Sequence, residues 1–223
     1  MMLSMKRFVQ AGFISGLLAA GMVAQAAEPA AAAPAKVDDS GPSQLIESSA
    51  NVMLKDIDKN RAQYRKDPSG LYKLVGDTLL PNFDTAYAAQ RVLGIHWKNA
   101  SAEQRERFVK AFYESLLYTY GDAMIDFSAD RLKVFPNKPE AAATSATVRT
   151  QVKRSNGTPV DVFYTMRKVD GGWKAWDVVI DGISYVKSYR EDYGAEVQQK
   201  GLDSVISRLE AKAAAAKAGK KTT

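Results

Sequence analysis

The chain has 223 residues, a formal net charge of +6 at pH 7, no cysteine and one histidine. Its length suits one domain with a sizeable core. The lack of cysteine excludes disulfides, thiolate metal sites and a lipid anchor on cysteine, and a single histidine excludes a histidine-rich metal site.

Residues 1–26 have the layout of a secretory signal peptide. Lys6 and Arg7 precede an apolar run from Phe8 to Val23, and small residues follow at Ala24 and Ala26. A membrane-anchoring helix is the alternative, but the run is short for one and contains three glycines. We therefore expect an exported, soluble mature protein, and export argues against a nucleic-acid partner for the mild basic excess.

The exported part divides into three regions by composition. Residues 27–42 are rich in alanine and proline and are expected to form a disordered leader. Residues 43–210 are expected to form one domain. Residues 211–223 are an Ala/Lys-rich tail that is able to prolong a helix before it frays.

Apolar residues recur at helical spacing in six segments of this domain. Ser101 and Gln104 form a capping box that predicts the start of one helix, and Ser184 is positioned to cap another. The predicted helices are 43–64, 68–79, 84–93, 101–120, 185–199 and 202–209.

Between the fourth and fifth helices the apolar period changes to two, which predicts strands. Asn156-Gly157 and Asp170-Gly171-Gly172 are hairpin turn sequences and indicate antiparallel neighbours. The predicted strands are 131–135, 145–153, 160–167 and 173–180. The order of helices, meander and helices predicts an α+β fold in which helices cover one face of an antiparallel sheet.

Few residues offer catalytic chemistry. A Ser-His triad would need His96, whose place at a helix end is more typical of a packed or solvent-facing histidine. Asp177 lies in the apolar strand 173–180, where a carboxyl group can have a raised pKa and act as acid or base. The alternative, which we favour, is that Asp177 accepts hydrogen bonds from a turn or pairs with Arg167 or Arg190.

The domain also holds more apolar side chains than a simple two-layer core requires. The wide apolar face of 101–120, both alternating sets of 173–180, and Leu79, Phe83 and Tyr87 are able to line a cavity. An aromatic stripe at helical spacing is more often ordinary core, so this pattern alone does not decide between the two.

Several motifs in a fixed order resemble the MlaC family, also called toluene-tolerance auxiliary proteins, which are the periplasmic phospholipid-binding components of the Mla system. The resemblance runs from about residue 43 to residue 209, and the Ala/Pro leader and Ala/Lys tail fall outside it. The matching motifs are Val92-Leu93-Gly94-x-His96-Trp97, Ser101-x-x-Gln104-Arg105-x-x-Phe108, Leu116-x-x-x-Tyr120-Gly121, Gly172-Trp173-Lys174-x-Trp176-Asp177-Val178-x-Ile180-x-Gly182-Ile183-Ser184, Tyr189-Arg190 and Gly201-Leu202-Asp203.

The resemblance implies an NTF2-like α+β fold with a curved sheet, and a cavity between sheet and helices that holds phospholipid acyl chains. It implies a periplasmic carrier that moves lipid between an outer-membrane lipoprotein–porin complex and the inner-membrane Mla ABC transporter complex, and so maintains outer-membrane lipid asymmetry. Phospholipid is the expected ligand, without metal, other cofactor or catalytic residue.

The resemblance, together with the cavity pattern that includes Leu79, also implies a set of ligand-contacting residues. Arg167 and Arg190 are expected nearer the rim, close to the headgroup. The residues expected against the acyl chains are Leu79, Trp97, Phe112, Leu116, Tyr120, Tyr164, Met166, Trp176, Val178 and Ile183.

An enzyme of the same general fold is the alternative hypothesis. It would act on a small hydrophobic substrate, with Asp177 as acid or base and Tyr164 as a hydrogen-bond donor, in the manner of ketosteroid isomerase.

Overall fold

The computed structural model describes residues 37–153 and 156–218. The predicted signal peptide, most of the predicted leader and the end of the tail lie outside these residues. The elements are α1 (Pro42–Lys66), α2 (Ser69–Leu79), η1 (Leu80–Asn82), α3 (Thr85–Leu93), α4 (Ile95–Asn99), α5 (Ala102–Tyr120), η2 (Asp122–Asp126), η3 (Ala129–Arg131), β1 (Leu132–Val134), β2 (Ser145–Lys153), β3 (Pro159–Val169), β4 (Gly172–Ile180), β5 (Ile183–Ser184), α6 (Tyr185–Lys200) and α7 (Leu202–Lys217).

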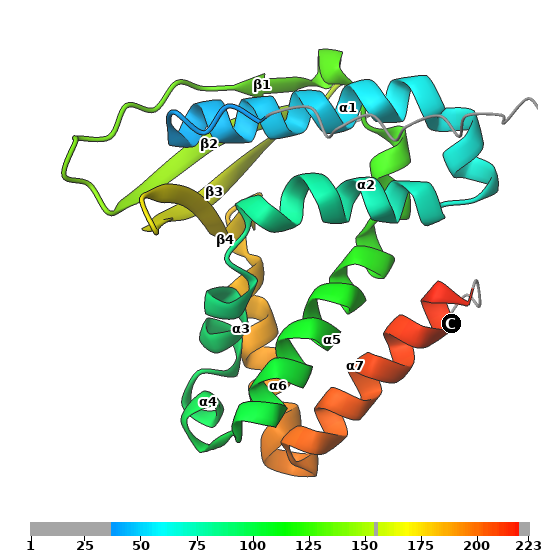
Figure 1. Cartoon of the computed structure of the whole chain (residues 1–223), viewed down its shortest axis with the longest axis vertical. Coiled ribbons are helices and arrows are strands. Elements are labelled where there is room, and N and C mark those ends of the chain that lie inside the picture. The colour runs from blue at the N-terminus through cyan, green and yellow to red at the C-terminus, as the bar shows by residue number, and fades with distance from the viewer. Residues whose placement is uncertain (1–36, 154–155, 219–223) are drawn as a thin grey trace, which may run out of the picture. The chain divides into compact units, whose positions relative to one another are not determined.

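The strands form one antiparallel five-stranded sheet in chain order, β1 to β5. The α+β prediction is confirmed, and α1 lies across one face of the sheet (Figure 1). The prediction missed β5, a strand of only two residues. It forms because Asp181 and Gly182, at φ 50° and 80°, turn the chain tightly enough to pair Ile180 with Ile183.

A β-bulge in β4 explains part of its doubly apolar sequence. Thr165 pairs with Asp177 and Met166 with Ala175, so Trp176 is an extra residue in β4. Residues before and after the bulge therefore share a face although their spacing is odd, and Ala175 and Val178 lie on the same side. A bulge also increases local twist and curves the sheet.

Most of the buried apolar residues in the described part of the chain belong to three clusters. The helical cluster joins α3, α5, α6 and α7, and the α5 and α7 ribbons run side by side (Figure 1). The sheet cluster lies between α1 and the sheet and contains Leu45, Val148, Met166, Trp173 and Ala175. The α2 cluster joins α1, α2 and η2 through Ile57, Tyr64, Leu71, Val75 and Ile125.

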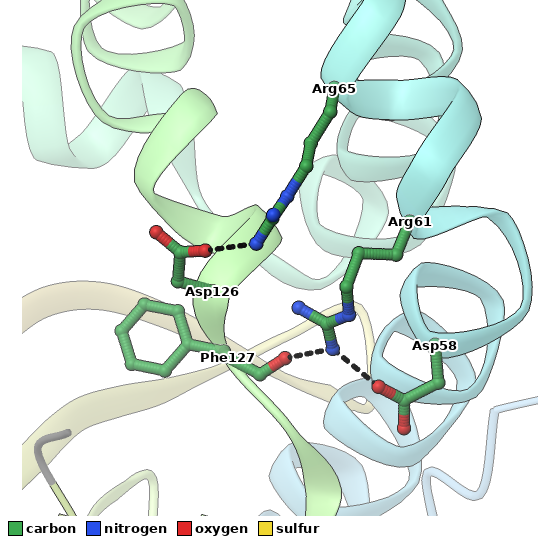
Figure 2. A network of polar contacts seen from close by, with 5 residues as sticks. All are labelled: Asp58, Arg61, Arg65, Asp126 and Phe127. Atoms are coloured by element: carbon green, nitrogen blue, oxygen red, sulfur yellow. Dashed lines mark hydrogen bonds and ion pairs between the residues drawn. The ribbon is translucent and has the colours of Figure 1, made fainter.

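Two arginines of α1 hold the segment that follows α5 (Figure 2). Arg61 Nη2 donates to the carbonyl oxygen of Phe127 at 2.8 Å and also bonds Asp58, while Arg65 Nη2 lies 3.0 Å from Asp126 Oδ1. The Arg65–Asp126 pair is largely exposed, so it stabilises the fold only modestly. Together with the Arg61–Phe127 hydrogen bond, this pair connects α1 to the segment that leads towards β1.

Within residues 37–153 and 156–218, no helix is both long enough and apolar enough to cross a bilayer.

The two glycines Gly94 and Gly194 allow a matched test of backbone strain. Gly94 joins α3 to α4 at φ 54° and ψ −117°, a region that side-chain-bearing residues rarely adopt, whereas Gly194 lies within α6 with open space around it. We expect Gly94→Ala to lower the free energy of unfolding by about 1–3 kcal/mol. Gly194→Ala should raise it by about 0.5–1 kcal/mol. Urea denaturation measures both, and equal effects would contradict the assigned backbone conformation of Gly94.

Candidate functional site

The buried carboxylate of Asp177 joins β4 to the start of α6. Its side chain is buried, its Oδ2 accepts a hydrogen bond from Ser184 Oγ at 2.7 Å, and its Oδ1 accepts one from the Val186 amide at 3.0 Å. Ser184 also caps α6 by accepting from the Lys187 amide at 3.0 Å. A carboxylate at a helix N-terminus is further stabilised by the helix dipole. Asp177 therefore fixes the position at which α6 leaves the sheet.

These contacts decide between the expectations for Asp177. Hydrogen bonding from the turn between β4 and α6 is confirmed, and no ion pair between Asp177 and an arginine is found among the described residues. Arg167 instead places Nε 3.1 Å from Asp84 Oδ2 and its guanidinium carbon 4.2 Å from the centre of the Tyr87 ring. Because donors of the chain engage both oxygens of Asp177, the geometry favours a structural role for this carboxylate over an acid–base role.

An aromatic ladder connects the helical cluster to the surface between α5 and α6. Phe112 stacks on Phe108 with ring centres 5.7 Å apart and meets the edge of Tyr189 at 5.4 Å. Tyr189 stacks on Tyr193 at 5.4 Å, and the Tyr120 and Tyr189 hydroxyls lie 2.9 Å apart. Burial raises the pKa of Tyr189 and of Tyr193, so both phenols stay protonated and neutral.

A groove of about 460 Å³ opens at the outer end of this ladder. Its volume lies within the range of ordinary ligand pockets. Two predicted ligand-contacting residues, Tyr120 and Ile183, line it and are 41% and 60% exposed. Its full lining is Tyr120, Ile180, Asp181, Ile183, Tyr185, Ser188, Tyr189 and Asp192.

Sequence reasoning missed the contribution of α6 to this groove. Tyr185, Tyr189 and Tyr193 recur every four residues, which places them on one helical face. This spacing was the available signal, whereas we expected only Arg190 of α6 near the ligand.

The other predicted ligand-contacting residues lie in separate parts of the fold. The structure brings some of them together in pairs or threes, but it does not gather the whole set around this groove. Trp97, Phe112 and Leu116 belong to or pack on the helical cluster, Tyr164 and Met166 to the sheet cluster, and Leu79 to the α2 cluster, while Val178 lies on β4 and Trp176 contacts Tyr87 and Arg91.

The predicted rim arginines differ in their surroundings. Arg190 is exposed on α6, and its guanidinium lies against Gly94 at the C-terminal end of α3. Arg167, by contrast, is held between Asp84 and Tyr87. The charge of Arg167 is thus already matched within the chain.

Metal ligands do not cluster in the part of the chain that the structure describes: no group of three or more His, Asp or Glu side chains there is placed to hold an ion. His96 is half-buried on α4.

Asp177→Asn tests the structural role of this carboxylate. Asparagine keeps one acceptor but loses the charge and the acceptor for Ser184, so we expect the free energy of unfolding to fall by about 1.5–3 kcal/mol. Asp170→Asn is the control, because Asp170 is exposed in a turn at φ 51° that asparagine tolerates. Chemical denaturation of both variants gives the comparison, and an undiminished stability of Asp177→Asn would contradict the structural role of this carboxylate.

Comparisons with known proteins agree with this architecture. A family model described as MlaC protein matches residues 47–211. The Intermembrane phospholipid transport system binding protein MlaC of Haemophilus influenzae is 28% identical over 177 residues, which cover 78% of this chain and 83% of that protein. Toluene tolerance protein ttg2D of Pseudomonas putida is 28% identical over 163 residues, or 73% of this chain and 75% of that protein.

A solved structure shares the fold. It is a phospholipid-binding protein from Ralstonia solanacearum in complex with a phospholipid, with a TM-score of 0.63 and 23% sequence identity, and the match covers 76% of this chain and 97% of that chain. The resemblance carried by the spaced motifs is therefore confirmed, and the chain belongs to the MlaC family.

Proposed function

We propose that this protein is a periplasmic phospholipid carrier that encloses acyl chains and leaves the headgroup in water. Membership of the MlaC family supports the proposal, as does the fold shared with a protein solved in complex with a phospholipid. The names of the Haemophilus influenzae and Pseudomonas putida relatives describe transport and toluene tolerance. Together with the internal contacts of Asp177, this leaves the enzyme hypothesis without a supporting observation.

Half-buried apolar side chains at the margins of the three clusters carry the proposal. One larger core with smaller satellite clusters is the usual arrangement of a domain, so the margins matter here and not the number of clusters. Neighbouring residues of α5, Leu116 and Leu117, pack on different clusters. Leu79 and Tyr164 are the corresponding margin residues of the α2 cluster and the sheet cluster. Acyl chains that contact these margins would complete the core.

The energetics of lipid transfer explain why a carrier is needed. Burial stabilises a hydrocarbon chain by about 0.8 kcal/mol per methylene, so two acyl chains with roughly 30 methylenes gain about 24 kcal/mol on leaving water. A phosphate buried without a partner would cost far more than it gained. The headgroup therefore stays at the surface, where exposed Arg190 is our candidate partner and Arg167 is the weaker one.

The proposed route runs between two membranes. Residues 1–26 would direct export, and the carrier would exchange lipid with an outer-membrane lipoprotein–porin complex and with the inner-membrane Mla ABC transporter complex, so maintaining outer-membrane lipid asymmetry. Release requires that a docked partner binds a low-affinity conformation preferentially, since only differential binding shifts such an equilibrium.

Lipid content tests the proposal most directly. The full chain, expressed with residues 1–26 and purified from the periplasmic fraction without added lipid, should yield close to one or more phospholipids per protein on organic extraction. Mass spectrometry and phosphate analysis measure the ratio. Folded protein that carries no phospholipid, and takes none up from vesicles, would contradict the carrier.

Two exposed isoleucines provide a matched test of the groove. Ile183 lines the groove and is 60% exposed, whereas Ile95 on α4 is 66% exposed outside it. Because neither side chain is buried, glutamate at either position should leave the fold intact. We expect Ile183→Glu to lose most bound phospholipid, because it replaces an apolar side chain of the groove with a carboxylate beside those of Asp181 and Asp192 and leaves less apolar surface for acyl chains.

Ile95→Glu is the control and should keep its phospholipid. Thermal unfolding of both variants checks that folding is unchanged. Equal lipid content in the two variants would remove Ile183 from the proposed site.

A further inference from the structure

The hydroxyl of Tyr113 is buried between α5 and α2 and has no hydrogen-bond partner among the described residues. Arg167 Nε is also buried without a hydrogen bond among the described residues, but it lies 3.1 Å from the Asp84 carboxylate. Other tyrosines on this side of the fold are satisfied, since Tyr72 donates to Asp122 at 2.6 Å and Tyr64 donates to Asp56. A buried hydroxyl without a partner is rare in native proteins and usually marks a group that something else engages.

Gly76 of α2 faces this hydroxyl. A Cβ atom at Gly76 would lie 4.0 Å from Tyr113 Oη and 3.9 Å from Leu80 Cδ1, which are ordinary contact distances. The packing of the chain thus leaves room for alanine there, although glycine is the less favourable residue inside a helix. The side-chain-free position Gly76 and the unpartnered hydroxyl of Tyr113 therefore face each other between α2 and α5.

The same place borders the surface proposed for acyl chains. Tyr113 precedes Leu116 and Leu117 by three and four residues, so the three lie on neighbouring positions of one α5 face. Burial raises the pKa of the Tyr113 phenol to about 12, so the hydroxyl keeps its proton at neutral pH. It can therefore donate a hydrogen bond to an acceptor on a bound ligand.

We infer that the Tyr113 hydroxyl donates a hydrogen bond to an ester carbonyl of the bound phospholipid, beside the space left by Gly76. This inference rests on the proposed carrier function and adds a chemical preference to it. The protein would select diacyl lipids, whose chains begin with ester carbonyls, over dialkyl ethers, which have no such acceptor. Hydrocarbon burial does not distinguish the two, because it depends on the apolar area removed from water.

A competition between two lipids measures this preference. Purified protein is incubated with vesicles of equal parts dioleoyl phosphatidylglycerol and its dioleyl ether analogue, then re-isolated, and the bound lipids are quantified by mass spectrometry. The wild-type protein should be enriched in the diester on the order of tenfold, the size expected for one hydrogen bond. Tyr113→Phe should bind the two lipids in a ratio near one.

Two further variants separate this contact from general effects. Tyr72→Phe also removes a phenol but should keep the ester preference, because Tyr72 is bonded to Asp122. Gly76→Ala should reduce total bound lipid without lowering the unfolding temperature, since it fills the space beside the hydroxyl.

The outcomes distinguish the inference from the function on which it rests. Wild-type protein that takes up neither lipid would reject the carrier itself. Wild-type protein that binds diester and ether equally, or a Tyr113→Phe variant that keeps the preference, would overturn only the hydrogen bond to Tyr113.

Discussion

The position of α6 relative to the sheet depends on one buried carboxylate. Asp177 on β4 accepts hydrogen bonds from Ser184 and from the Val186 amide, so the strand end, the tight β4–β5 hairpin and the first turn of α6 are one rigid unit. The bulge at Trp176 immediately precedes it. Because α6 starts from this unit, Asp177 also determines where Tyr185 and Tyr189 lie, and hence where the groove opens.

Because polar contacts position several elements of this fold, its apolar clusters need not merge into one core. α1 takes part in the sheet and α2 clusters, and α5 in the helical and α2 clusters, so each of these two helices connects two clusters. Polar contacts such as Asp177–Ser184 and Arg61–Phe127 fix the elements independently of complete apolar packing. The margins between clusters can then contact a ligand without being needed for folding.

Two features that lower stability have a common explanation in the proposed lipid. A buried tyrosine hydroxyl without a partner among the described residues and a glycine inside α2 are each unfavourable in a protein selected only for packing. Departures of this kind are concentrated at functional sites in natural proteins. Ile183, Tyr113 and Gly76 are the residues at which we place ligand contact.

Local sequence determined the longer helices, though not the five-residue α4, and it determined the capping box at Ser101, the hairpin turns and the α+β class, because each depends on residues close together in the chain. The family also followed from spaced motifs. Only the tertiary structure decided the bulge at Trp176, the two-residue strand β5, the partners of Asp177 and the distribution of the predicted ligand residues over the groove, the clusters and β4. These depend on strand register and on contacts between distant segments, and a shift of one residue in a strand reverses the face that each side chain occupies.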